Sequence, residues 1–239
     1  MAEYKNTFKR VEKKYILTRD QFDTLKCELH DRLGEDKYSY STISNIYFDT
    51  PDSQLIRKSI EKPIYKEKLR LRCYQTPTDY TPSFVELKKK YKGVVYKRRA
   101  AMPYVDAYDL MVHNVKPHGI DGQVYDEIRY AKDYYKTIQP AMFLSYDREA
   151  LFLIDEPKIR LTFDTNIIYR TTELDLRCGV YGDILMNDEK YICELKLTSA
   201  IPLDICRLFD KLHIYPASYS KYGNAYIKTH KKSIILHAN

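Results

Sequence analysis

Lys68, Arg70 and Arg72 occupy every second position of the segment 67–73. Successive side chains of a β-strand point to opposite faces, so an extended chain sends these three cations one way and the apolar residues between them the other. Guanidinium groups bind closely spaced phosphate oxygens through paired hydrogen bonds, and lysine adds a compact point charge. The pattern therefore indicates a strand whose charged face binds a polyanion such as a triphosphate.

The same alternation of charged and apolar residues recurs at 84–88, 159–164 and 191–196. Several strands of this kind predict a sheet closed round a cationic lining, with a nucleotide or an anionic polymer as its ligand. The alternative is an open sheet whose charged face is simply solvated, and alternation alone is compatible with both. The central strands are almost entirely basic on this face, whereas a solvated face mixes both signs, and this favours the lining. An enclosed group of cations is costly to hold without carboxylates or a bound anion.

Three glutamates share the charged faces, each standing singly beside cations: Glu12, Glu86 and Glu194. Carboxylates in this setting suit a divalent metal ion beside bound phosphates, because Mg²⁺ and Mn²⁺ prefer hard oxygen ligands. Such a metal would neutralise charge and polarise the phosphoryl group. Glu194 and Glu12 are therefore candidate metal ligands, whereas Glu86 is equally compatible with a structural ion pair to a neighbouring lysine.

The chain of 239 residues has a formal net charge of +7, with basic residues concentrated at 62–72 and 88–99. This length suits a single domain over 1–239. The charge suits phosphates, nucleic acid or an acidic membrane surface. The seven glycines form no glycine-rich phosphate loop, which disfavours P-loop and dinucleotide-binding folds, and the six histidines lack metal-ligand spacing. Phosphate must therefore be held by side chains.

Cysteine usage and hydropathy bear on the cellular compartment. The five cysteines are odd in number and never form Cys-x-x-Cys, which disfavours a disulfide framework and a thiolate zinc site. The segment 1–14 is polar and charged, and no run approaches the roughly 20 apolar residues that span a bilayer. We therefore expect a soluble cytoplasmic protein without a transmembrane segment.

Hydrophobic periodicity and turn residues predict alternating groups of strands and helices. A helix is expected at 19–32, a helical turn at 52–59, a helical insertion at about 105–139 and C-terminal helices within about 202–230. The segments predicted as strands are 8–17, 44–49, 67–75, 83–91, 94–103, 141–148, 151–154, 158–164, 174–185 and 190–196. This order predicts an α+β protein.

Eight short pieces of the chain together resemble, in order and spacing, the VTC domain of the triphosphate tunnel metalloenzymes, a CYTH-like superfamily. The resemblance implies an antiparallel β-barrel tunnel of about eight strands flanked by helices. It also implies polyphosphate synthesis from ATP with a divalent metal, Mn²⁺ or Mg²⁺. The pieces are Arg10–Lys14, Tyr47–Thr50, Lys68–Arg72, Val85–Lys88, Tyr146–Arg148, Ile159–Asp164, Glu194–Lys196 and Ser218–Tyr222.

Carried over position by position, the resemblance implies catalytic roles for Lys14, Arg70, Arg72, Lys88, Arg148 and Glu194. It assigns the metal to Glu194, with Glu12 as a second ligand. Phosphate binding falls to Lys14, Lys68, Arg70, Arg72, Lys88, Lys97, Arg99, Arg148, Arg160, Lys196 and Lys221, assisted by Ser220.

Two departures from the family pattern concern the first strand and the region before the paired arginines. Arg10 stands where the superfamily motif has its first glutamate, which argues against the thiamine-triphosphatase and adenylate-cyclase branches. A further arginine of eukaryotic VTC enzymes falls near Ser59, so that Lys66 or Lys68 must compensate.

The sequence leaves several functions open. The first is a polyphosphate polymerase-like phosphotransferase that uses ATP. The others are a hydrolase of triphosphate or polyphosphate, and a non-catalytic sensor of polyphosphate or nucleotide. Nucleic acid is not the expected ligand, although Tyr74, Tyr91 and Tyr96 stand among basic residues as a single-strand site requires. Eukaryotic family members carry membrane segments that this sequence lacks, and a membrane-protein partner stays open.

Overall fold

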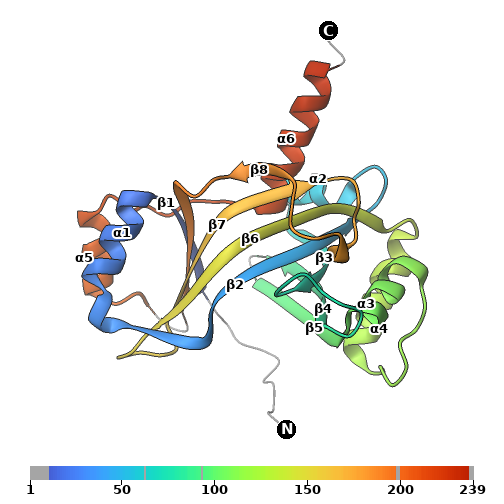
Figure 1. Cartoon of the computed structure of the whole chain (residues 1–239), viewed down its shortest axis with the longest axis horizontal. Helices are drawn as coiled ribbons and strands as arrows, with labels where there is room; N and C mark the ends of the chain where they lie inside the picture. The colour runs from blue at the N-terminus through green and yellow to red at the C-terminus, as the bar shows by residue number, and fades with distance from the viewer. Residues whose placement is uncertain (1–10, 62, 93, 198–199, 237–239) are drawn as a thin grey trace. The chain divides into compact units, whose positions relative to one another are not determined.

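The computed structural model describes residues 11–61, 63–92, 94–197 and 200–236. The chain divides into two compact units. Unit 1 comprises residues up to Thr42 together with Tyr146–Ile167 and Met186–Tyr219, and unit 2 comprises Ile43–Ser145, Ile168–Leu185 and the residues from Ser220. Strands β2 (Leu33–Asp49), β6 (Gln139–Leu153) and β7 (Arg160–Arg170) contribute residues to both units (Figure 1). The single domain stays a prediction.

The sheet of unit 1 is built around β9 (Lys190–Leu197), which pairs antiparallel with β1 (Val11–Thr18) on one side and with β7 on the other. The alternation read from the sequence sorts the side chains, because Cys193 and Leu195 enter the core while Glu194 and Lys196 share the opposite face. Residues 8–10 of the predicted first strand lie outside the described residues.

Helices α1 (Arg19–Glu28) and α5 (Leu203–Lys211) cover the apolar face of unit 1, with the short 3₁₀ turn η1 (His30–Arg32) following α1 (Figure 1). A capping box starts α1: the Gln21 amide donates to the Thr18 hydroxyl, and the Thr18 amide donates to the Gln21 side chain. The Phe22 ring then stacks on Tyr191, with 3.9 Å between centroids. These contacts fix the sheet from behind its charged face.

Unit 2 contains the three central strands in sequential antiparallel order: β3 (Tyr65–Cys73), β4 (Pro82–Tyr91) and β5 (Val94–Pro103), with the last residues of β2 paired to β3. Their apolar face packs under α3 (Tyr104–Tyr108), the π-helical turn η2 (Asp109–His113) and α4 (Gln123–Tyr135). Glu127 of α4 pairs with Lys89 and Arg98 and so holds the helical layer on this face.

Two further helices of unit 2, α2 (Gln54–Ile60) and α6 (Lys221–Leu236), are joined through one buried carboxylate. Asp49, at the end of β2, accepts hydrogen bonds from the amides of Leu55 and Ile56 at the start of α2. It also accepts one from the hydroxyl of Tyr222 on α6, at 3.0 Å. An anion is favourable at a helix N-terminus, so Asp49 positions both helices beside the sheet.

The predicted strands at 67–75, 83–91, 94–103 and 190–196 and the helical insertion are confirmed within a few residues. Strand β2 is much longer than the predicted 44–49, because its polar first half lacks the apolar alternation that reveals a strand. The two strands predicted at 141–148 and 151–154 form one continuous strand, β6. Gly34 of β2 leaves room for the Phe152 ring of β6, because a Cβ atom at position 34 would lie 2.5 Å from that ring.

The strand predicted at 174–185 is wrong except for β8 (Asp183–Met186). The segment instead contains the 3₁₀ turn η3 (Leu176–Cys178) and winds round Arg170, whose guanidinium donates to the carbonyl oxygens of Glu173, Asp175, Gly179 and Tyr181. Arg170 lies 3.6 Å from the centroid of the Phe143 ring. In this segment, hydrogen bonds from one arginine side chain to four carbonyl oxygens take the place of the backbone hydrogen bonds that would join a strand to its neighbour.

The α+β class and the antiparallel sheet with flanking helices are confirmed. Within the described residues, none of the helices is long and apolar enough to cross a membrane.

Candidate functional site

The face of β3–β5 opposite the core carries eight cations and one carboxylate. Register places Lys68, Lys88 and Lys97 directly opposite one another across the three strands. Like charges in such positions repel, so this row favours the binding of an anion. The cations of the face are Lys66, Lys68, Arg70, Arg72, Lys88, Lys90, Lys97 and Arg99, and the carboxylate is Glu86.

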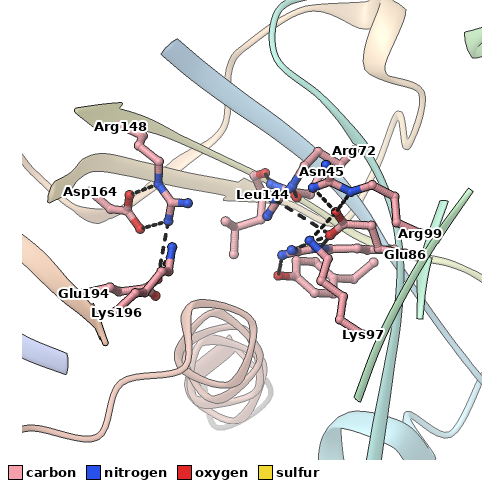
Figure 2. Close-up of polar contacts among 12 residues, drawn as sticks. Asn45, Arg72, Glu86, Lys97, Arg99, Leu144, Arg148, Asp164, Glu194 and Lys196 are labelled. Atoms are coloured by element: carbon pink, nitrogen blue, oxygen red, sulfur yellow. Dashed lines mark hydrogen bonds and ion pairs between the residues drawn. The ribbon is translucent and has the colours of Figure 1, made fainter. Parts of the chain in front are cut away.

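Glu86 is the centre of this face (Figure 2). Its side chain is 1% exposed, and its carboxylate lies 2.6 Å from the Arg70 guanidinium, 2.7 Å from the Lys97 amine and 2.5 Å from Arg99. Arg72 lies further away, at 3.9 Å. Burial opposes the charge, but the four cations hold the pKa of Glu86 far below its usual range. Of the two interpretations of Glu86, the contacts support the ion pair.

Two residues of β2 orient the paired arginines. The Arg72 guanidinium donates to the side-chain oxygen of Asn45 at 3.0 Å, and Asn45 in turn donates to the carbonyl of Leu144. The Arg70 guanidinium donates to the hydroxyl oxygen of Tyr47 at 3.1 Å. Asn45 and Tyr47 share the face because they pair with Arg72 and Arg70 in register. The sequence placed Tyr47 in a family piece without a role and did not single out Asn45.

Crowding of like charges shifts two pKa values on this face. Burial, together with the charges on Arg99 and Arg72, lowers the pKa of Lys97 to about 7, although Glu86 acts in the opposite direction. Burial would raise the pKa of Tyr47, but Arg70, Lys68 and Arg72 outweigh it and lower the value to about 8. Both groups therefore change charge near neutral pH, in the direction that reduces the positive charge of the face.

The start of α6 lies at the row of lysines. Lys68 donates to the Ser220 hydroxyl at 2.9 Å, and the same oxygen accepts from the Gly223 amide at 3.1 Å, as an N-cap residue does. Lys221 is the first residue of the helix. Lys66 donates to the carbonyl of Ser59 at 3.1 Å, where the family's additional arginine is missing.

Unit 1 holds a second group of charged residues, centred on Glu194. Its carboxylate lies 2.8 Å from the Lys14 amine, 3.6 Å from Lys196 and 3.8 Å from Arg148. Arg148 forms a two-point ion pair with Asp164, at 2.5 and 2.7 Å (Figure 2). The paired hydrogen bonds to Asp164 fix the guanidinium plane of Arg148 beside Glu194.

The pKa values of this group follow from burial against neighbouring charge. Burial lowers the pKa of Lys14, but Glu194 outweighs it, so the value is raised. Burial also opposes Arg148, yet Tyr146, Asp164 and Glu194 keep its pKa well above the ordinary value. Lys196 is different, because burial and the charge on Arg148 together lower its pKa. The Glu194 group therefore holds two firmly charged cations and one weakened one.

Thr162 lies beside Glu194, and the sequence assigned it no role in the site. It pairs directly with Glu194 in register, so its side chain lies on the same face, and it is 5% exposed. Its hydroxyl oxygen is buried and has no hydrogen-bond partner among the described residues. A buried polar atom without a partner is costly, so the Thr162 hydroxyl has the capacity to bind one further group.

A divalent metal fits this donor set when phosphates supply further ligands. The described residues contain no group of three or more histidines, cysteines and carboxylates that could hold a metal by themselves. Mg²⁺ is usually bound through one or two carboxylates plus substrate phosphates and water. Glu194 offers one such carboxylate, Glu12 is its diagonal neighbour in register beside Lys196, and the Thr162 hydroxyl adds a neutral oxygen.

The structure places the predicted site residues in three ways. Lys68, Arg70, Arg72, Lys97 and Arg99 gather round Glu86 and Ser220 in unit 2, with Lys88 among them by register. Lys14, Arg148 and Lys196 gather round Glu194 in unit 1. Arg160 is opposed to Lys196 in register, but its guanidinium pairs with Asp36 and its side chain is 42% exposed. Its role in phosphate binding stays a prediction.

The structure is that of an α+β domain whose antiparallel sheet has a strongly cationic face and flanking helices. The sequence pattern of the VTC domain matches residues 9–230, and the chain belongs to the VTC domain family. The resemblance stated from the sequence is therefore confirmed.

One solved structure shares the fold at low sequence identity, and two others align with lower TM-scores. A proposed adenylate cyclase from Bacillus halodurans aligns with a TM-score of 0.55 at 17% identity, over 88% of this chain and 93% of that chain. A protein from Pyrococcus horikoshii gives 0.46 at 11% identity, over 92% and 99%. A proposed adenylyl cyclase from Hippeastrum, described as having a dominant triphosphatase activity, gives 0.46 at 12%, over 89% and 93%. A comparison with the curated proteins found no match.

Proposed function

We propose that this protein is a metal-dependent phosphoryl-transfer enzyme that acts on triphosphate, and that it is polyphosphate polymerase-like, with ATP as phosphoryl donor. Membership of the VTC family supports the substrate class. The observation that carries the proposal is the row of Lys68, Lys88 and Lys97, directly opposed across three strands. Glu86 offsets part of this repulsion at Lys97, and a multiply charged anion bound along the row would offset it at all three lysines.

In this proposal the cationic face of unit 2 binds the phosphates. Arg70 and Arg99 are already oriented by Glu86, and Arg72 by Asn45, so little side-chain freedom remains to be lost when the anion binds. Lys68 and the N-cap Ser220 bring the positive end of α6 to the same row. Phosphoryl transfer needs mainly positioning and charge neutralisation from the protein, which such a face supplies.

The Glu194 group is proposed to supply the metal ligands, with Glu12 and Thr162. A divalent ion bound there would neutralise phosphate charge and polarise the phosphoryl group. Lys14 and Arg148 position the Glu194 carboxylate from two sides. That the sheet closes into the tunnel implied by the resemblance is part of this proposal.

The test is incubation of the protein with ATP and Mn²⁺ or Mg²⁺, with products resolved by chain length. We expect a ladder of polyphosphate that requires the metal. Free phosphate without chains would replace the polymerase with a hydrolase, and tight triphosphate binding without turnover would identify a sensor. If the protein neither binds triphosphate nor releases phosphate, the proposed function is wrong.

The Glu194→Gln variant tests the metal-ligand role of Glu194 in the same assay. It keeps the shape of the side chain and removes the charge, so we expect turnover to fall at least about a hundredfold while triphosphate binding to the cationic face of unit 2 is largely retained. The matched control is Glu189→Gln, an exposed carboxylate of the same unit before β9. If Glu194→Gln turned over at the wild-type rate, Glu194 would not be a metal ligand.

We also propose a reducing, cytoplasmic location. The supporting observation is that all five cysteines are free thiols, two of them buried in the cores.

A further inference from the structure

Six apolar residues are exposed together at one end of β3, β4 and β5, the end where β4 turns into β5. Their exposed fractions range from 42% to 68%. Register confirms the cluster, since Tyr65, Tyr91 and Val94 are directly opposed across the three strands. We call this cluster the hairpin-end surface: Ile64, Tyr65, Tyr91, Val94, Val95 and Tyr96.

The hairpin-end surface is positively charged. The segments 64–66, 90–92 and 94–96 contain three lysines and no acidic residue. Lys90 is opposed to Lys66 on one side and to Val95 on the other, and the Lys92 amine lies 5.4 Å from the centroid of the Tyr91 ring. The ligand of this surface must therefore be both anionic and able to bury apolar side chains.

Both faces of the strand ends carry apolar groups. Tyr65, Tyr91 and Val94 share one face, while Val95 lies on the other with Lys66 and Lys90. Apolar side chains on both faces of a strand end do not line a groove that a rigid partner could fill. They suit insertion of the strand ends into a fluid interface that contacts both faces.

We propose that the hairpin-end surface docks the protein on an anionic lipid bilayer. Tyrosine is enriched at membrane interfaces, and the negative surface potential of an anionic membrane attracts lysines that lie close to it. Triphosphate or polyphosphate would attract the lysines but would leave Ile64, Val94 and Val95 in water. Single-stranded nucleic acid would stack on the tyrosines but not on these aliphatic residues. If a second copy of the chain bound this surface through the same residues, the lysines of the two copies would lie close together and repel one another.

The experiment is co-sedimentation of the full chain with vesicles of phosphatidylcholine alone or with added phosphatidylserine. We expect binding to the anionic vesicles that is at least about tenfold tighter and that weakens with salt. The double variant Val94→Glu/Val95→Glu should lose at least about tenfold in binding to these vesicles. The matched control is Ile184→Glu on β8, an apolar residue 61% exposed in the same unit, which should bind as the wild type does.

Two further measurements keep the result specific. Lys90→Gln/Lys92→Gln should weaken vesicle binding without changing the apolar side chains, and thermal unfolding should show that all variants are folded. Val94→Glu alone, on the face opposite the cations, should still weaken vesicle binding, and its triphosphate binding should match the wild type, which separates this inference from the proposed function. Equal sedimentation with both vesicle types would overturn the inference. The inference would also be overturned if the wild type bound no vesicles and the valine variant instead lost oligonucleotide binding or self-association.

Discussion

The guanidinium of Arg70 donates a hydrogen bond to the phenolic oxygen of Tyr47 at 3.1 Å, and the Tyr47 ring stacks on Tyr222 with 4.4 Å between centroids. Tyr222 in turn donates to Asp49, which binds the start of α2. One chain of contacts therefore joins the sheet arginine to helices α2 and α6 within unit 2. The position of Arg70 depends on the packing of both helices.

Tyr47→Phe tests this relationship. The variant keeps the stacked ring and removes the acceptor of Arg70, so we expect triphosphate to bind about 3- to 10-fold more weakly. Isothermal titration calorimetry measures the change, and Tyr40→Phe, at an exposed tyrosine of unit 1, is the control. The pKa of about 8 adds a second effect, because a phenolate forms as pH rises through 8 and repels the anion. This part of the pH dependence should be absent from Tyr47→Phe, and its persistence would assign it to another group.

Lys97 predicts a pH dependence of its own. Its pKa is about 7 in the protein without ligand, and a bound triphosphate favours the charged amine and raises that value. Affinity should therefore be complete below pH 7 and fall as pH rises above 7, by up to about tenfold per pH unit until the pKa of the complex is reached. Lys97→Arg stays charged at every pH in this range, so its affinity should be flat as pH rises through 7 and fall only where the Tyr47 phenolate forms. Proton uptake on binding, measured in buffers of different ionisation enthalpy, gives the same answer independently.

Glu86→Gln tests whether the carboxylate or the ligand holds the cationic face together. Removal of one partner from a buried ion-pair network costs about 3–5 kcal/mol in the free energy of unfolding. Triphosphate should restore more stability to this variant than to the wild type, because it supplies the missing negative charge. The pKa of Glu86 is lowered in the folded state, so its contribution is present above roughly pH 4.3 and is lost as pH falls.

Urea unfolding with and without triphosphate, at neutral and acidic pH, measures both parts of this prediction. Asp121→Asn is the control, because its ion pair with Lys116 is mostly exposed and should contribute little. A Glu86→Gln protein as stable as the wild type without ligand would contradict the central role of this carboxylate.

Local alternation was sufficient to predict the strands that carry the site. Arg70 and Arg72 could be assigned to one face of β3 because residues 67–73 alternate strictly. Register between strands was not predictable. Only pairing shows that Glu86 contacts cations from two neighbouring strands and that three lysines are directly opposed. Alternation says which face a residue occupies, not which residue lies beside it.

Two other features depended on interactions between distant residues. Arg160 has the same alternating context as the other cations, yet it pairs with Asp36 of the polar first half of β2, which no apolar pattern revealed. The segment 174–185 contains strand-forming residues, but Arg170 binds its carbonyl oxygens and Gly182 has φ of 153°. An added Cβ at Gly182 would lie 2.4 Å from the Tyr169 carbonyl oxygen, so close backbone approach defines this loop.

Thr162 gives the prediction that separates function from stability most clearly. Thr162→Val keeps the volume of the side chain and removes a buried hydroxyl that has no partner among the described residues. The free energy of unfolding should therefore be unchanged or rise by about 1 kcal/mol, whereas Mn²⁺-dependent triphosphate binding should weaken about tenfold. Thr162→Ser keeps the oxygen and should bind as the wild type does.

Thr165→Val is the matched control, since the Thr165 hydroxyl bonds to the carbonyls of Asn187 and Lys190 at the end of the same sheet. It should lose stability and keep Mn²⁺-dependent binding, the reverse of Thr162→Val. Thermal unfolding and calorimetric titration with Mn²⁺ and triphosphate measure the two quantities on the same samples. If Thr162→Val loses stability and keeps binding, its hydroxyl has a structural partner and no part in the Glu194 group.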